Sequence, residues 1–208
     1  MRKINRKSVF FRRVVTIVLF AAGARLYAVP PDVLQNGIAL HNTAESAADG
    51  RAEQSMAVLK PYIDSSAAAR AYYGSAMTKT AAYYKSSNPI KSLGLLKKGT
   101  AFIDEAVKKQ PDDSSLRILR LVNGIQISRS SPVKRYQVIK NDVGWFMEDG
   151  HIAALNKADK TTVSLYAGYY YVQANDIDTA VELFQDAVTN GSGTPDGAEA
   201  AAMLRKYE

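Results

Sequence analysis

Residues that cap or interrupt helices recur along this chain at short intervals, and this punctuation constrains the fold more than any other feature. Between the interruptions, apolar residues recur at spacings of three and four, the pattern of a helix with one buried face. No run of alternating residues bounded by turns predicts a strand. The intervening segments predict nine helices, near residues 32–47, 50–63, 66–86, 89–110, 113–128, 133–148, 158–174, 177–190 and 196–207.

Short helices joined by short turns pack as antiparallel neighbours. The pattern therefore predicts an all-α fold of four αα-hairpins and a closing helix over 196–207, which would cover the exposed end of the stack. The clearest helix start is Asn88-Pro89, because Asn caps a helix and Pro suits its first turn. The apolar face that we expect to be buried on this helix consists of Ile90, Leu93, Leu96, Ile103, Ala106 and Val107.

The segment 164–187 carries the most specific pattern in the chain. It contains Ala167-Gly168-x2-Tyr171 and then Ala180-x3-Phe184-x2-Ala187. This resembles the tetratricopeptide repeat (TPR), from which it departs at Ser164, Ala167 and Ser192. The resemblance implies hairpins stacked as a right-handed solenoid. Small Gly168 and Ala180 would let the two helices approach, and Tyr171 and Phe184 would fill the space around them.

A second, weaker copy lies upstream. Tyr73-Gly74-x2-Met77 resembles the first half of the repeat, and Gly99-x3-Ile103-x2-Ala106 resembles the second half. The spacing differs, because Gly74 and Ala106 are 32 residues apart whereas Gly168 and Ala187 are 19 apart. The repeat is therefore degenerate, and the residues expected to pack it are Gly74, Ala106, Gly168, Tyr171, Ala180, Phe184 and Ala187.

The first 28 residues have the composition of a bacterial signal peptide. They hold seven basic residues and no acidic one, followed by the apolar run Val14–Ala24 and by Leu26-Tyr27-Ala28. An apolar run of 11 residues is shorter than the roughly 20 that span a bilayer. We expect cleavage after Ala28 and export of a single helical domain, 29–208, to the periplasm or cell envelope. An uncleaved membrane anchor is the alternative.

The net charge of +7 would suit a nucleic-acid or membrane-surface binder, but it lies in the N-terminal segment. The remaining chain has 20 basic and 20 acidic residues, so we expect no nucleic-acid partner and membrane contact only through an uncleaved N-terminus. The basic and the acidic residues are concentrated in different parts of the sequence. Residues 97–140 carry a net +6 and residues 142–208 a net −7, which gives an electrostatic means of orienting a partner.

Nothing in the sequence predicts an enzyme, a cofactor or a metal site. The chain has no cysteine and only two histidines, and of these we expect His41 to face solvent. Asp112-Asp113 is interpreted as a helix cap and Asp142 as part of a solvated helix end. No phosphate-binding loop or nucleophile motif occurs.

The clustered tyrosines of 166–171 are the remaining candidates for a site. Counting from Gly168 places Tyr171 on the packed side, and it places Thr162, Tyr166, Tyr169 and Gln173 on the concave surface of a TPR-like array. The alternative is that these rings only pack against the next hairpin.

The predicted function is that of an exported, non-enzymatic interaction or scaffold protein that binds a peptide or protein. Two alternatives remain: a small-ligand-binding accessory protein of an envelope transport system, and a membrane-tethered assembly factor.

Overall fold

The computed structural model describes residues 28–46, 48–148 and 150–207. This part of the chain is all-α, as predicted, with no strand and with one turn of 3₁₀-helix at Lys60–Tyr62. The predicted signal peptide lies almost wholly outside the described residues. None of the described helices is long and apolar enough to cross a membrane. The α-helices are α1 Pro31–Asn42, α2 Arg51–Leu59, α3 Ala67–Tyr83, α4 Pro89–Lys109, α5 Ser114–Ser130, α6 Tyr136–Met147, α7 Lys157–Gln173, α8 Ile177–Asn190 and α9 Pro195–Tyr207.

Local capping explains most of these boundaries. Asn88 accepts a hydrogen bond from the Lys91 backbone N–H at 3.0 Å, and Pro89 follows it at the first helical position. Asp113 caps α5 as predicted. The first helix is shorter than predicted and ends at Asn42, because Asp49 accepts backbone hydrogen bonds from residues 45, 46 and 51 and so organises a loop.

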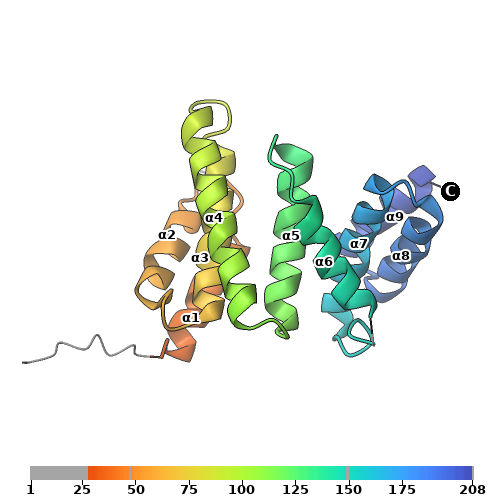
Figure 1. The fold of residues 1–208 in the computed structure, drawn as a ribbon, viewed down its shortest axis with the longest axis horizontal. Helices are drawn as coiled ribbons and strands as arrows, with labels where there is room; N and C mark the ends of the chain where they lie inside the picture. Colours follow the sequence, from red (N-terminus) through yellow and green to blue (C-terminus); the bar gives the residue numbers. More distant parts are fainter. Residues whose placement is uncertain (1–27, 47, 149, 208) are drawn as a thin grey trace, which may run out of the picture.

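The helices pack in sequence order as hairpins α1–α2, α3–α4, α5–α6 and α7–α8, followed by α9 (Figure 1). Each odd-numbered helix after α1 contacts both helices of the hairpin before it. Within the described residues, no even-numbered helix contacts another even-numbered helix. The odd-numbered helices therefore form one continuous layer along the stack. The even-numbered helices form a second layer, in which the described helices do not contact one another.

The residues expected to pack the two repeats lie at helix contacts. A Cβ atom on Gly74 of α3 would lie 2.5 Å from the carbonyl oxygen of Gly99 in α4, and a Cβ on Gly99 would lie 2.5 Å from that of Gly74. Gly168 of α7 faces the ring of Phe184 in α8, which a Cβ would meet at 2.5 Å. Six of the seven residues are buried, namely Gly74, Ala106, Gly168, Ala180, Phe184 and Ala187.

The apolar core is unevenly distributed. One cluster runs without a break through α5–α9 and includes Phe146, Leu165 and Phe184. In the described part of the chain, two small clusters link α3 and α4 to α5: Ala71, Ala106, Val107 and Leu116 form the first, and Ala81, Leu96 and Ile127 form the second. Between the second and third hairpins, part of the contact is polar, as in the 2.6 Å hydrogen bond from Asn123 Nδ2 to Thr78 Oγ1.

The predicted apolar face of α4 is buried except at its start, where the prediction was wrong. Ile90 is 85% exposed and Leu93 is 42% exposed, whereas Leu96, Ile103 and Val107 are buried. Helix α4 has 21 residues against 17 in α3, and its first turn is left without cover. These two side chains are therefore the most prominent apolar groups on this part of the surface.

Candidate binding groove

A groove runs along the odd-numbered layer and encloses about 470 Å³. Every residue that lines it belongs to one of the five odd-numbered helices. It lies on the face that the packing pattern makes continuous. The lining residues are His41 and Asn42 of α1, Ser75 and Lys79 of α3, Leu119, Val122, Asn123 and Gln126 of α5, Thr162 and Tyr166 of α7, and Asp196 of α9.

Hydrogen bonds across the groove join neighbouring odd-numbered helices. His41 Nε2 lies 2.8 Å from Ser75 Oγ, and Gln126 Nε2 donates to the Tyr166 hydroxyl at 3.2 Å. Thr162 Oγ1 donates to the Asp196 carboxylate at 2.6 Å. These bonds fix the spacing of the helices along the floor of the groove, so the surface is preformed.

His41 does not face solvent as predicted; its side chain is buried, with 5% exposure. Its ring also packs edge-on against Tyr72, at 5.2 Å between ring centroids. Burial lowers the pKa of His41 from 6.5 to about 4, because the charged imidazolium is poorly solvated there. The ring is therefore neutral at pH 7, and one of its nitrogens is a hydrogen-bond acceptor.

Lys79 is the one cation that lines the groove. Its ammonium donates to the carbonyl oxygens of His41 at 2.9 Å and of Ala44 at 3.1 Å, at the end of α1, where a positive charge complements the helix dipole. Burial lowers the pKa of Lys79. Lys79, Asn123 and Gln126 also line a second cavity, so the groove and that cavity adjoin.

Two of the four predicted binding residues, Thr162 and Tyr166, line the groove, and Tyr169 and Gln173 do not. Tyr169 is only 4% exposed: its hydroxyl donates to the Glu199 carboxylate, and Arg129 lies over its ring, 4.0 Å from the centroid. The expectation that Tyr169 is open on the concave surface was therefore wrong.

Gln173 is exposed at the end of α7, outside the lining. Tyr171, which was expected to be fully packed, is only partly buried. These two positions are among the last three residues of α7 before the turn at Ala174, where fewer neighbours surround the helix.

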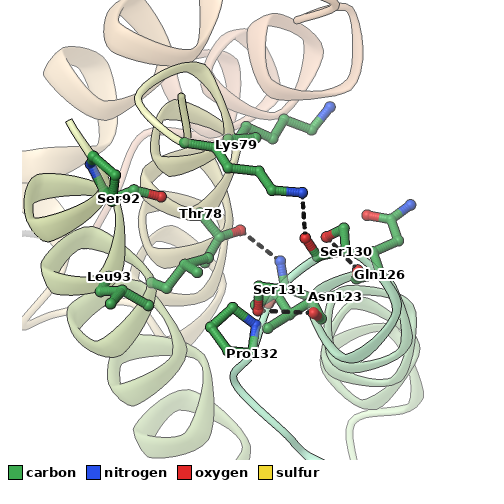
Figure 2. Close-up of a pocket in the computed structure, with 14 residues that line it drawn as sticks. Thr78, Lys79, Ser92, Leu93, Asn123, Gln126, Ser130, Ser131 and Pro132 are labelled. Carbon is green, nitrogen blue, oxygen red and sulfur yellow. Dashed lines mark hydrogen bonds between the residues drawn. The ribbon is translucent and has the colours of Figure 1, made fainter. Parts of the chain in front are cut away.

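The second cavity encloses about 400 Å³ between the second and third hairpins (Figure 2). Its wall is mostly apolar. The lining comes from α3, from Lys85 in the turn after α3, from the first two turns of α4, from the second half of α5 and from the loop that follows α5. It is a cavity between repeats, beside the groove.

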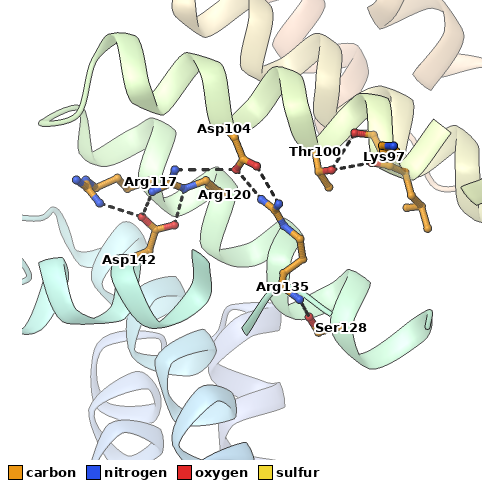
Figure 3. Close-up of polar contacts among 9 residues, drawn as sticks. Lys97, Thr100, Asp104, Arg117, Arg120, Ser128, Arg135 and Asp142 are labelled. Carbon is orange, nitrogen blue, oxygen red and sulfur yellow. Dashed lines mark hydrogen bonds and ion pairs between the residues drawn. The ribbon is translucent and has the colours of Figure 1, made fainter. Parts of the chain in front are cut away.

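A network of ion pairs crosses the interface between the second and third hairpins (Figure 3). Across this interface, the Arg135 guanidinium makes two hydrogen bonds to Asp104 of α4, at 2.6 and 2.8 Å, and Arg120 of α5 lies 4.0 Å from the same carboxylate. Within the third hairpin, Arg120 also makes two hydrogen bonds to Asp142 of α6, at 2.6 and 2.8 Å. Arg117 adds a third bond to Asp142 at 2.9 Å. Asp142 is fully buried, which corrects the prediction of a solvated helix end.

No group of three or more His, Asp or Glu side chains within the described ranges is arranged to hold a metal ion. The groove combines amide and hydroxyl groups with the apolar side chains of Leu119 and Val122, and its lining residues come from five successive odd-numbered helices. Such a surface can bind an extended chain through hydrogen bonds. Comparisons with known proteins add no relative: no family model, curated protein or solved structure matches the chain.

His41, Lys79, Asn123 and Gln126 line the groove but were not predicted as binding residues from the sequence. A signal for two of them exists, because Asn123 and Gln126 interrupt the otherwise apolar stretch 121–127 and lie three residues apart, on one helix face. For His41 and Lys79 there is no local signal, since the partners that they bind in other helices lie more than 30 residues away.

Proposed function

We propose that this protein is a non-enzymatic binding protein that holds an extended peptide segment of a partner protein in the groove along α1, α3, α5, α7 and α9. The observation that carries the proposal is that all eleven lining residues come from these five helices. The resemblance of 164–187 to the TPR supports it, because the concave surface of such arrays is made by the first helix of each hairpin. We expect the same right-handed curvature here.

The chemistry of the lining supports a peptide in particular. The backbone of an extended peptide carries donors and acceptors that must be paired when they leave water. Asn123 and Gln126 use their amide nitrogens to bind Thr78 and Tyr166, so their amide oxygens can accept from a peptide N–H. Leu119 and Val122 provide apolar contact between these polar groups.

The composition of residues 1–28 supports a role outside the cytoplasm, in the bacterial periplasm or envelope. Sequencing the N-terminus of the protein recovered from its native envelope tests this part of the proposal. A mature N-terminus at Val29 is expected. An intact Met1 would favour the membrane-tethered alternative.

The binding proposal is tested by selecting random 12-residue peptides, displayed on phage, against the full chain. Gln126→Arg places a bulky cation in the groove at an exposed position, and we expect it to weaken selected peptides about tenfold or more. Gln137→Arg on α6 is the matched control, because it makes the same change on the even-numbered layer. Equal affinities of selected peptides for the two variants would contradict the groove as the binding surface.

A further inference from the structure

The cavity between the second and third hairpins has a wall that a folded domain does not normally leave uncovered. Leu93 lines it and is 42% exposed, and Leu96 and Ile127 of the small apolar cluster also line it. A volume of about 400 Å³ lies in the range of pockets that hold small molecules or single large side chains. An apolar surface of this kind marks a place where another apolar group binds.

The charged groups on the cavity all have one sign. Lys79 and Lys85 line it, and none of the described acidic side chains does. Lys85 Nζ donates to the carbonyl oxygen of Ser130 at 2.7 Å, which links the turn after α3 to the end of α5 beside the cavity. An ammonium has three donors, so Lys85 can bind an anionic group and keep this bond.

The cavity also continues into the groove. Lys79, Asn123 and Gln126 line both, so a peptide lying in the groove passes the entrance of the cavity. Figure 2 shows Asn123 and Gln126 on α5, with Thr78 and Lys79 facing them from α3. A side chain that leaves the peptide at this point has an apolar wall to contact and a cation beside it.

We propose that this cavity is the anchor pocket for one large apolar side chain of the bound peptide, and that Lys85 selects an acidic residue next to that anchor. This inference rests on the proposed function and specifies its ligand: a peptide with an adjacent pair of a large apolar residue and Asp or Glu. The apolar residue supplies contact area and the acidic residue supplies charge complementarity.

The peptides selected on the full chain provide the first test. We expect them to share the apolar–acidic pair, and we expect Ala82→Trp to weaken them about tenfold or more, because Ala82 is exposed and its replacement would fill the cavity. Leu93→Ser should also weaken them. Ile90→Ser is the matched control, since Ile90 lies on the same helix, is 85% exposed and does not line the cavity.

The charge preference has its own pair of variants. Lys85→Glu should shift the selected residue beside the anchor from Asp or Glu to Lys or Arg, whereas Lys98→Glu, an exposed lysine of α4 outside the cavity, should not. Selected peptides without the apolar–acidic pair, or unaffected by both Ala82→Trp and Leu93→Ser, would overturn the anchor inference and leave the groove function intact.

A second measurement examines the cavity without an extended peptide. N-acetyl-Asp-Phe-amide is titrated into the full chain, with N-acetyl-Lys-Phe-amide as the charge control, and the backbone amide NMR signals of residues 92–96 and 126–131 are followed. Saturable shifts that are larger for the acidic compound support the inference, and equal or absent shifts overturn it. Binding of the acidic compound, together with failure to select any 12-residue peptide, would contradict the groove function alone.

Discussion

The hairpins α3–α4 and α7–α8 both have a glycine where their two helices meet, but the group that faces this glycine differs between them. In α3–α4, Gly74 and Gly99 face one another and the two backbones touch. In α7–α8, Gly168 faces the ring of Phe184. The hairpin α7–α8 has Ala180 where α3–α4 has Gly99, so a Cβ atom is present in α7–α8 at a position where α3–α4 has none.

The difference teaches that a small residue at this position has two uses. Where its partner is also glycine, it lets two helices pack at backbone distance. Where its partner is aromatic, the small residue leaves room for the ring to pack against the helix backbone. The two kinds of contact predict different responses to the same kind of substitution, because a carbonyl oxygen is fixed by the helix and a ring can turn.

Removing the ring of Phe184 should have the largest effect. Phe184 is fully buried, and its ring stacks near Tyr207 and meets Tyr169 edge-on. We expect Phe184→Ala to lower the free energy of unfolding by about 3–5 kcal/mol. Ile103→Ala, the equivalent change in α3–α4, should cost less within the range of about 2–5 kcal/mol, because touching backbones leave a smaller cavity. Urea unfolding measures both, and a larger loss for Ile103→Ala would break the comparison.

Acid should weaken the packing of α1 on α3 beside the glycine contact. The pKa of His41 is lowered from 6.5 to about 4 by burial, so below pH 6.5 the unfolded chain binds a proton that the folded chain does not. Stability due to His41 is therefore lost as the pH falls from 6.5 to about 4, at up to ~1.4 kcal/mol per pH unit.

The control for this effect is His41→Gln, which keeps a donor for Ser75 and cannot titrate in this range. Urea midpoints measured at pH 7 and pH 4.5 should differ less for the variant than for the unmodified protein. An identical pH dependence in the two proteins would show that the imidazole is not buried in the folded state.

Adding a methyl group at the glycine contact should have an intermediate effect. Gly99→Ala directs a Cβ at the Gly74 carbonyl oxygen, and we expect a loss of about 1–3 kcal/mol from overpacking. Gly168→Ala should cost less, because its new Cβ meets the edge of a ring that can rotate. Thermal melts of the two variants give the order, and the reverse order would mean that the contact between Gly168 and Phe184 is the more rigid one.

The smallest expected effect has the opposite sign. Gly94 lies in the same helix as Gly99, but a Cβ there would meet nothing within 4 Å. Gly94→Ala should raise stability by about 0.5–1 kcal/mol, because alanine loses less backbone freedom than glycine on entering a helix. A loss at this position, in the same thermal melts, would show that the cost at Gly99 is not specific to the backbone contact.

The helices and hairpins could be predicted from sequence because caps and turns are local. Asn88 and Asp113 act on backbone groups within three residues of themselves. The side of α7 on which each tyrosine lies could not be predicted as well. The face of each tyrosine was predicted from its position relative to Gly168, which takes only one partner helix into account. In the structure α7 contacts α5, α6, α8 and α9, so Tyr169 is buried against Glu199 of α9 on a side that was expected to be open.

His41 and Asp142 show the same limit for polar residues. Each looked solvated because its partners in other helices lie far away in the sequence, although the adjacent Asn42 also binds His41, with 2.8 Å between Nδ1 and Oδ1. The partners are Ser75, 34 residues after His41, and Arg117 and Arg120, 25 and 22 residues before Asp142. A local pattern contains no information about such pairs, and the fold has to bring them together before their burial becomes favourable.

Ion pairs join the second and third hairpins, so neither hairpin can be replaced by another one without losing these pairs. Stacked repeats that meet through apolar faces can be duplicated, deleted or exchanged, since one apolar face fits another. Here Asp104 on one side needs Arg135 and Arg120 on the other, so a hairpin inserted at this junction would leave an acidic group without its cation. Duplication or deletion of hairpins during evolution is therefore better tolerated elsewhere in the stack, and the order of the hairpins at this junction is fixed by charge.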